Sequence, residues 1–210
     1  MKATLAILTV LGLTGLTLAN SIPSQNVATS SLCQDLKDFK NLIPVKKMIN
    51  LAHEYYVHDP EFKKAVDYIY SSEFKELTEK IKASPAVAEV KSYLKKKGFD
   101  ARELVASQLR SMPQMKITGG GFAGFFQDLQ ALIPVNEIKS LYDKKLVTSK
   151  KFALLIEIIT SPELKSLTNK IRLDPTVQQA VKKLKSFDFD LHTVMEYLNS
   201  NFGRVFKGLF

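Results

Sequence analysis

Few side chains in this sequence stand at spacings that could do chemistry. His53 and His58 are five residues apart, so on one helix they point about 140° away from each other and do not share a face as histidines at i and i+4 do. Cys33 is the only cysteine, which excludes an internal disulfide and a structural zinc site with its roughly four ligands. The sequence therefore predicts no metal site and no cofactor.

Two further patterns could suggest catalysis. Asp67 and Glu157 occupy the same position of a repeat described below, as a paired acid and base would, but a solvated helix face explains both carboxylates more simply. The glycine-rich stretch 119–124 lacks the Lys-Ser/Thr of a phosphate-binding loop, and no strand precedes it. No Gly-x-Ser-x-Gly elbow is present. We therefore expect a protein that is not an enzyme.

Basic residues dominate the charge, with 30 Lys and Arg against 21 Asp and Glu and a net charge of +9. The lysines form short groups spread along the chain and mixed with acids, and none belongs to a motif that reads bases. We expect no nucleic-acid partner. A weak attraction to anionic surfaces, including membranes, follows from the net charge.

The elements that carry these residues read as helices. The 210 residues are 45% hydrophobic and 24% charged, which is ordinary globular composition rather than that of a disordered chain or a polytopic membrane protein. Apolar residues recur at steps of three and four over 45–56, 62–69 and 74–81, and the period-two alternation of strands is missing. Asp59-Pro60, Ser84-Pro85 and Asp174-Pro175 pair a capping residue with a first-turn proline, and Asp100 to Glu103 has the form of a capping box. The predicted fold class is all-α.

An internal repeat organises these helices. The block DFKNLIPV begins at Asp38 and DLQALIPV begins at Asp128, an offset of 90 residues that persists without a gap as far as Asp190. We expect two tandem repeats of about five to six short amphipathic helices, which enclose a shared apolar core or cavity. The predicted repeats span 33–112 and 122–210, the second with a short C-terminal tail, and a Pro- and Gly-rich linker spans 113–121.

The N-terminus predicts secretion. An uncharged apolar stretch from Leu5 to Leu18 ends in small residues that suit cleavage after Ala19, so we expect a signal peptide over 1–19 and a polar segment over 20–32. The alternative is a membrane anchor, but the stretch is shorter than the ~20 residues that a spanning helix needs. In an oxidising compartment, Cys33 is either a shielded free thiol or the link of a disulfide dimer, so the oligomeric state stays open.

One predicted helix differs between the copies. Residues 152–159 are apolar nearly all round, whereas the equivalent helix of the first copy carries Lys63 and Lys64. A helix of that kind is expected to be surrounded by others, so we predict a central position. It is either a packed core helix or one wall of a ligand cavity.

Four features occur together: the twin Leu-Ile-Pro-Val blocks, the Ser-x-Glu-aromatic/Leu-Lys-x-Leu blocks at Ser71 and Ser161, the 90-residue period and the leader. With them, the chain resembles the insect allergen-related repeat family. That family includes the major cockroach allergen type, insect midgut microvillar proteins and nitrile-specifier proteins. The resemblance implies helices closed into a capsule whose apolar interior takes up fatty acids and phospholipids, in a protein of the gut lumen or microvillar surface.

The first expectation is therefore a secreted lipid-binding protein with no catalytic residue and with bound fatty acids or phospholipids. The alternatives are a nitrile-specifier-like detoxification factor and a membrane-active, lytic protein that exchanges lipids. The candidate lipid-contacting residues are the apolar residues of the helical stripes: Val45, Met48, Ile49, Phe62, Val66, Ile69, Phe74, Leu77, Ile81, Val135, Ile138, Phe152, Leu155, Ile156, Ile159, Leu164, Leu167, Ile171, Val177, Val181, Leu184, Val194 and Leu198.

Overall fold

The structure is a computed structural model that describes residues 27–99 and 117–206. Every regular element in these two ranges is an α-helix, which confirms the predicted all-α class. The helices are α2 (Val27–Leu42), α3 (Val45–His58), α4 (Pro60–Ile69), α5 (Ser72–Ala83), α6 (Pro85–Lys96), α7 (Gly121–Leu132), α8 (Val135–Thr148), α9 (Lys150–Thr160), α10 (Pro162–Leu173), α11 (Pro175–Lys185) and α12 (Leu191–Phe206).

Side-chain caps set the starts of the short helices. The Asp59 carboxylate accepts hydrogen bonds from the backbone at the start of α4, and Asp174 does the same for α11. Ser84 caps α6 in the same way. Each of these three capping residues is followed by a proline at the first helical position, which confirms the predicted start signals. The predicted capping box at Asp100 lies outside the described residues.

The helix starts recur at a constant offset. Helix α3 begins at residue 45 and α8 at 135, α4 at 60 and α9 at 150, α5 at 72 and α10 at 162, and α6 at 85 and α11 at 175. Each pair is 90 residues apart, so the sequence repeat is also a repeat of local structure.

The helices of the two halves pack mainly against each other. Helix α2 lies against α8 and α9, and its later equivalent α7 lies against α3 and α4. In the same way, α6 packs against α10, and α5 packs against α11. The two halves are therefore interleaved with an approximate twofold relation, while neighbouring helices of one half, such as α3 and α4, also pack on each other.

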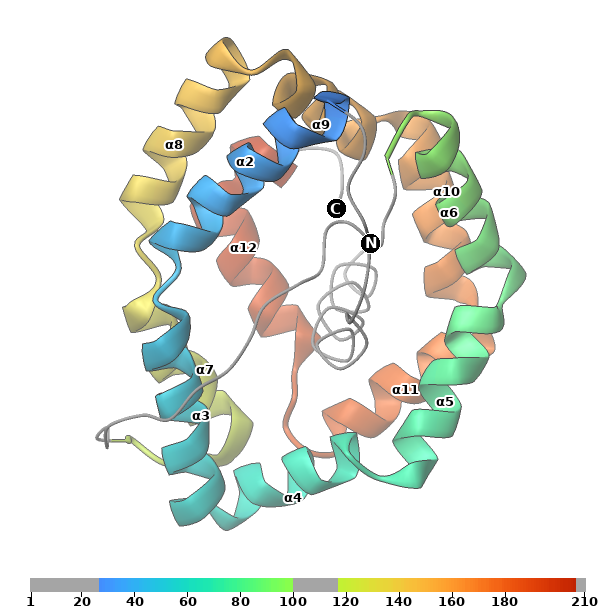
Figure 1. Cartoon of the computed structure of the whole chain (residues 1–210). Coiled ribbons are helices and arrows are strands. Elements are labelled where there is room, and N and C mark those ends of the chain that lie inside the picture. The colour runs from blue at the N-terminus through green and yellow to red at the C-terminus, as the bar shows by residue number, and fades with distance from the viewer. Residues whose placement is uncertain (1–26, 100–116, 207–210) are drawn as a thin grey trace.

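Figure 1 shows the consequence for the overall shape. Helices α2 to α11 trace a closed outline, and α12 crosses the area inside that outline. Helix α12 has one break in its helical geometry, at Phe202. Among the described residues, no helix is long and apolar enough to cross a membrane.

Two predicted boundaries meet helices in the structure. Helix α2 begins at Val27, within the expected polar segment 20–32, and α7 begins at Gly121, the last residue of the expected linker 113–121. The predicted signal peptide 1–19 and linker residues 113–116 lie outside the described residues.

Candidate functional site

The buried apolar side chains form four separate clusters instead of one central core. The first joins α2, α6, α8, α9 and α10, and the second joins α5, α6, α10 and α11. The third brings α4, α5, α11 and α12 together, and the fourth joins α3, α4 and α7. A compact domain usually has one contiguous core. Here the apolar packing is instead distributed over the junctions between helices, along the wall that helices α2 to α11 form.

The clusters are connected in series by three half-buried residues. Val90 packs against both the first and the second cluster, and Val181 packs against both the second and the third. Phe122 packs against both the third and the fourth. The apolar contacts therefore run along the wall from one helix junction to the next.

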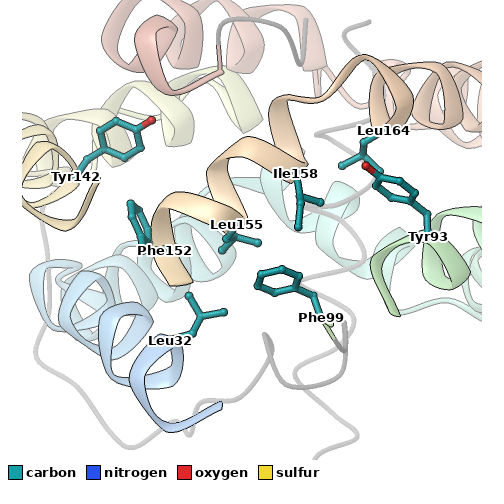
Figure 2. Packing of buried hydrophobic residues seen from close by; sticks show 8 residues of the cluster. All are labelled: Leu32, Tyr93, Phe99, Tyr142, Phe152, Leu155, Ile158 and Leu164. Carbon is teal, nitrogen blue, oxygen red and sulfur yellow. The ribbon is translucent and has the colours of Figure 1, made fainter. Parts of the chain in front are cut away.

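Figure 2 shows the first cluster around α9. Phe152, Leu155 and Ile158 lie along one face of this helix, and Leu155 and Ile158 point toward Phe99. The Phe152 ring stacks on Phe39 of α2 with ring centroids 5.3 Å apart. One face of α9 thus holds the two halves together.

The opposite face of α9 corrects the predicted central position of this helix. Leu154 keeps 40% of its surface exposed, and Glu157 is exposed as well. The helix is therefore not enclosed on every side, although Ile156 and Ile159 are half-buried against the first cluster. Single apolar residues on a surface are common, so an all-round apolar sequence did not require all-round burial.

The candidate lipid-contacting residues divide into two groups by exposure. The buried group packs within the four clusters and consists of Phe62, Phe74, Leu77, Ile81, Phe152, Leu155, Leu164, Ile171, Val177 and Leu184. The half-buried group consists of Val45, Met48, Ile49, Val66, Ile69, Val135, Ile138, Ile156, Ile159, Leu167, Val181, Val194 and Leu198. The second group has apolar surface that the described side chains leave partly uncovered.

The half-buried residues occur at equivalent positions of the two halves. Val45 on α3 matches Val135 on α8, and Met48 matches Ile138, each pair 90 residues apart. On the next helix of each half, Val66 and Ile69 of α4 match Ile156 and Ile159 of α9, and all four are half-buried. Partial exposure of these apolar side chains is thus a property of the fold.

Polar side chains join the halves where α3 meets α7. The buried Tyr55 hydroxyl donates a hydrogen bond to the Asp128 carboxylate over 2.6 Å, and the Thr118 backbone N–H and hydroxyl donate to the same carboxylate. The Gly121 N–H donates to Asp59 over 2.8 Å. These bonds fix the 117–121 segment, in which Gly119, Gly120 and Gly121 all have positive φ.

These hydrogen bonds set the ionisation of the groups involved. Burial, followed by the Asp128 carboxylate, raises the pKa of Tyr55 from 10.0 to about 12. Partial burial opposes ionisation of Asp128, but hydrogen bonds from Thr118 and Tyr55 outweigh it and keep the Asp128 pKa below its usual value. The donor is therefore neutral and the acceptor ionised at neutral pH.

An ion pair occupies the equivalent junction, where α2 of the first half meets α8 of the second. Lys145, 90 residues after Tyr55, contacts Asp35 and Asp38 over 2.6 Å each, and Asp38 lies 90 residues before Asp128. The Ser149 hydroxyl also donates to Asp35. The Lys145 hydrogen bond lowers the Asp38 pKa, and the hydrogen bond to Asp35 leads the effects that raise the Lys145 pKa. Two equivalent positions thus join the halves by different chemistry.

The residues weighed for catalysis or metal binding lie apart from these junctions. Asp67 is exposed and accepts a hydrogen bond from Tyr56, while Glu157 is exposed on α9. His58 lies 3.5 Å from Glu54 on the same helix. Within residues 27–99 and 117–206, no three His, Cys, Asp or Glu side chains come together as a metal site would require. Cys33 is a half-buried free thiol on α2.

Sequence reasoning missed the junction residues Tyr55, Asp128, Lys145 and Asp38. Both aspartates begin the repeated Leu-Ile-Pro-Val blocks, which was a usable signal. Their partners differ in type, tyrosine in one half and lysine in the other, so comparing the two copies did not reveal the pairing.

Most of the chain is similar to known proteins. Residues 31–195 match the family model described as insect allergen related repeat, nitrile-specifier detoxification. A curated relative, Protein G12 of Anopheles gambiae, is 26% identical over 197 aligned residues, which cover 88% of this chain and 93% of the relative. The family match runs from within α2 into α12 and so includes all of α3 to α11.

Proposed function

The chain belongs to the insect allergen-related repeat family, and from this membership and the packing of its helices we propose that it is a secreted, non-enzymatic protein that binds fatty acids or phospholipids between its two halves. The gut lumen or the microvillar surface is the proposed place of action. The acyl chains lie against the half-buried apolar residues of α3, α4, α8 and α9.

The distribution of the apolar packing carries this proposal. The four clusters lie in series along the wall, and the half-buried apolar residues at equivalent positions keep part of their apolar surface uncovered. Removing apolar surface from water is worth about 25 cal/mol per Å². An acyl chain that covers these side chains therefore gains binding free energy without a specific polar contact.

Two variants test the proposal against a matched control. Met48→Gln and Ile138→Gln place an amide at equivalent half-buried positions, and Val147→Gln makes a comparable change at a side chain that is 88% exposed. Displacement of a fluorescent fatty acid and the rise in melting temperature on adding palmitate measure binding. We expect both responses to weaken in the first two variants and to stay at the parent level in the control. Equal binding by all four proteins contradicts the proposed place of the acyl chain.

A nitrile-specifier role is the second candidate, because the description of the family includes nitrile-specifier detoxification. That role needs a polar or metal-holding site near a reactive substrate. A lytic role is a consequence of lipid exchange, and dye release from anionic vesicles measures it directly. The lipid-binding proposal requires neither activity.

A further inference from the structure

The hydroxyl of Tyr197 on α12 has an unusual environment. Its oxygen is buried and has no hydrogen-bond partner in the part of the chain that the structure describes, although the residue as a whole is only half-buried. A tyrosine ordinarily buries its ring and keeps its hydroxyl in water or on a partner. At Tyr197 the hydroxyl oxygen is out of water and has no such partner among the described residues.

Other tyrosines show how this fold usually treats the group. The hydroxyl of Tyr55 donates to Asp128, that of Tyr56 donates to Asp67, and that of Tyr93 lies 3.1 Å from the Ser161 hydroxyl. A buried polar group without a partner costs on the order of 1–3 kcal/mol. An unmade hydrogen bond at Tyr197 therefore calls for a physical reason.

The ring of Tyr197 packs against an aromatic side chain. Its ring meets Phe126 of α7 edge to face, with centroids 5.8 Å apart, and Val194 lies one turn before it on α12. Burial alone raises the pKa of Tyr197, with no contribution from a charged neighbour. The phenol therefore stays protonated and can donate a hydrogen bond.

We infer that the Tyr197 hydroxyl is the polar contact for a bound lipid, and that it donates a hydrogen bond to an uncharged acceptor, the carbonyl of an acyl ester. The inference rests on the proposed lipid binding and adds the class of ligand to it. Among the described residues, no charged neighbour contributes to the pKa shift of Tyr197, and burying an ionised carboxylate or phosphate without a paired charge is costly. An ester carbonyl accepts the bond without that cost.

Helix α12 suits this role by its position. It crosses the area inside the outline formed by the other helices (Figure 1), and its half-buried Val194 and Leu198 place apolar surface beside the tyrosine. A buried donor beside apolar side chains fixes the polar end of a ligand while apolar contacts supply most of the affinity.

The test compares two ligands that differ in the ester group. Delipidated full chain, Tyr197→Phe and the control Tyr56→Phe are titrated with methyl palmitate and with hexadecane, both delivered from cyclodextrin, against a fluorescent fatty acid. Tyr56→Phe removes a hydroxyl that already has a protein partner. We expect Tyr197→Phe to bind methyl palmitate about fivefold more weakly than the parent and hexadecane equally well, and the control to match the parent with both ligands.

Every other outcome overturns the assignment. Equal affinity of Tyr197→Phe and parent for methyl palmitate shows that the hydroxyl does not contact the ester, as when a water molecule is its partner. Equal weakening for both ligands shows a packing effect. A parent that binds neither ligand overturns the lipid proposal, and the assignment with it. Melting of the ligand-free variant checks its folding, and we expect a melting temperature no lower than that of the parent.

Discussion

Replacing Tyr55 with phenylalanine tests how the two halves are joined. The side chain is fully buried, its hydroxyl donates to Asp128 over 2.6 Å, and its ring contacts Phe62 and Phe125. Phenylalanine keeps the ring contacts and removes only the hydroxyl. A hydrogen bond to an ionised group contributes about 1.5–3 kcal/mol, so we expect the free energy of unfolding to fall by about 2 kcal/mol at pH 8.

The pH dependence of this loss identifies its cause. The pKa of Tyr55 is raised from 10.0 to about 12 in the folded protein, so the contribution of its hydroxyl is complete below pH 10 and is lost as the pH rises toward 12. From these two pKa values, the stability that the hydroxyl contributes falls by about 1.4 kcal/mol between pH 8 and pH 11. The difference between parent and Tyr55→Phe should therefore shrink by about that amount over this range.

Urea unfolding followed by circular dichroism at pH 8 and pH 11 measures the difference. Tyr70→Phe is the matched control, because this side chain is 81% exposed, and we expect it to unfold like the parent at both pH values. A Tyr55→Phe variant that is as stable as the parent at pH 8, or that loses the same free energy at both pH values, refutes the reasoning.

Three further changes probe the same architecture. Gly124→Ala places a Cβ atom 1.7 Å from the Gly119 carbonyl oxygen, so we expect thermal unfolding to show a loss of about 2–4 kcal/mol; Gly203→Ala, with open space around it, is the control. Lys145→Met removes the partner that lowers the Asp38 pKa; the stability that this lowered pKa contributes is present above pH 3.8 and is lost as the pH falls through the lowered value. The variant should therefore lose less stability on acidification than the parent, and equal acid sensitivity contradicts this. Chains 21–112 and 113–210, expressed apart, should lack cooperative unfolding by circular dichroism and recover it when mixed, because α2 packs on α8 and α7 packs on α3; a cooperative transition in either half alone argues against interleaving.

The sequence predicted the positions of the helices better than their neighbours. The capping residues before Pro60, Pro85 and Pro175 act within a few residues, and so they mark helix starts directly. The 90-residue offset likewise predicted equivalent helices. Neither signal states whether α2 packs within its own half or against α8 and α9, since amphipathic stripes are compatible with both arrangements.

The same limit applies to the site. The apolar stripes selected side chains that are all buried or half-buried, because helical periodicity reports which face turns away from water. Periodicity does not distinguish packing in a wall from contact with a ligand. The exposed Leu154 and the buried hydroxyl of Tyr197 depend on tertiary context that the local pattern does not contain.

The most direct test of lipid binding is the lipid content of the native protein. The full chain, purified from insect cells without denaturant or detergent, is extracted with organic solvent and analysed by mass spectrometry, with Met48→Gln as a parallel sample. The account predicts acyl lipids at about one or more molecules per chain and less in the variant, since acyl chains held by apolar contacts survive purification. A lipid-free parent whose melting temperature does not respond to added fatty acid would contradict the account.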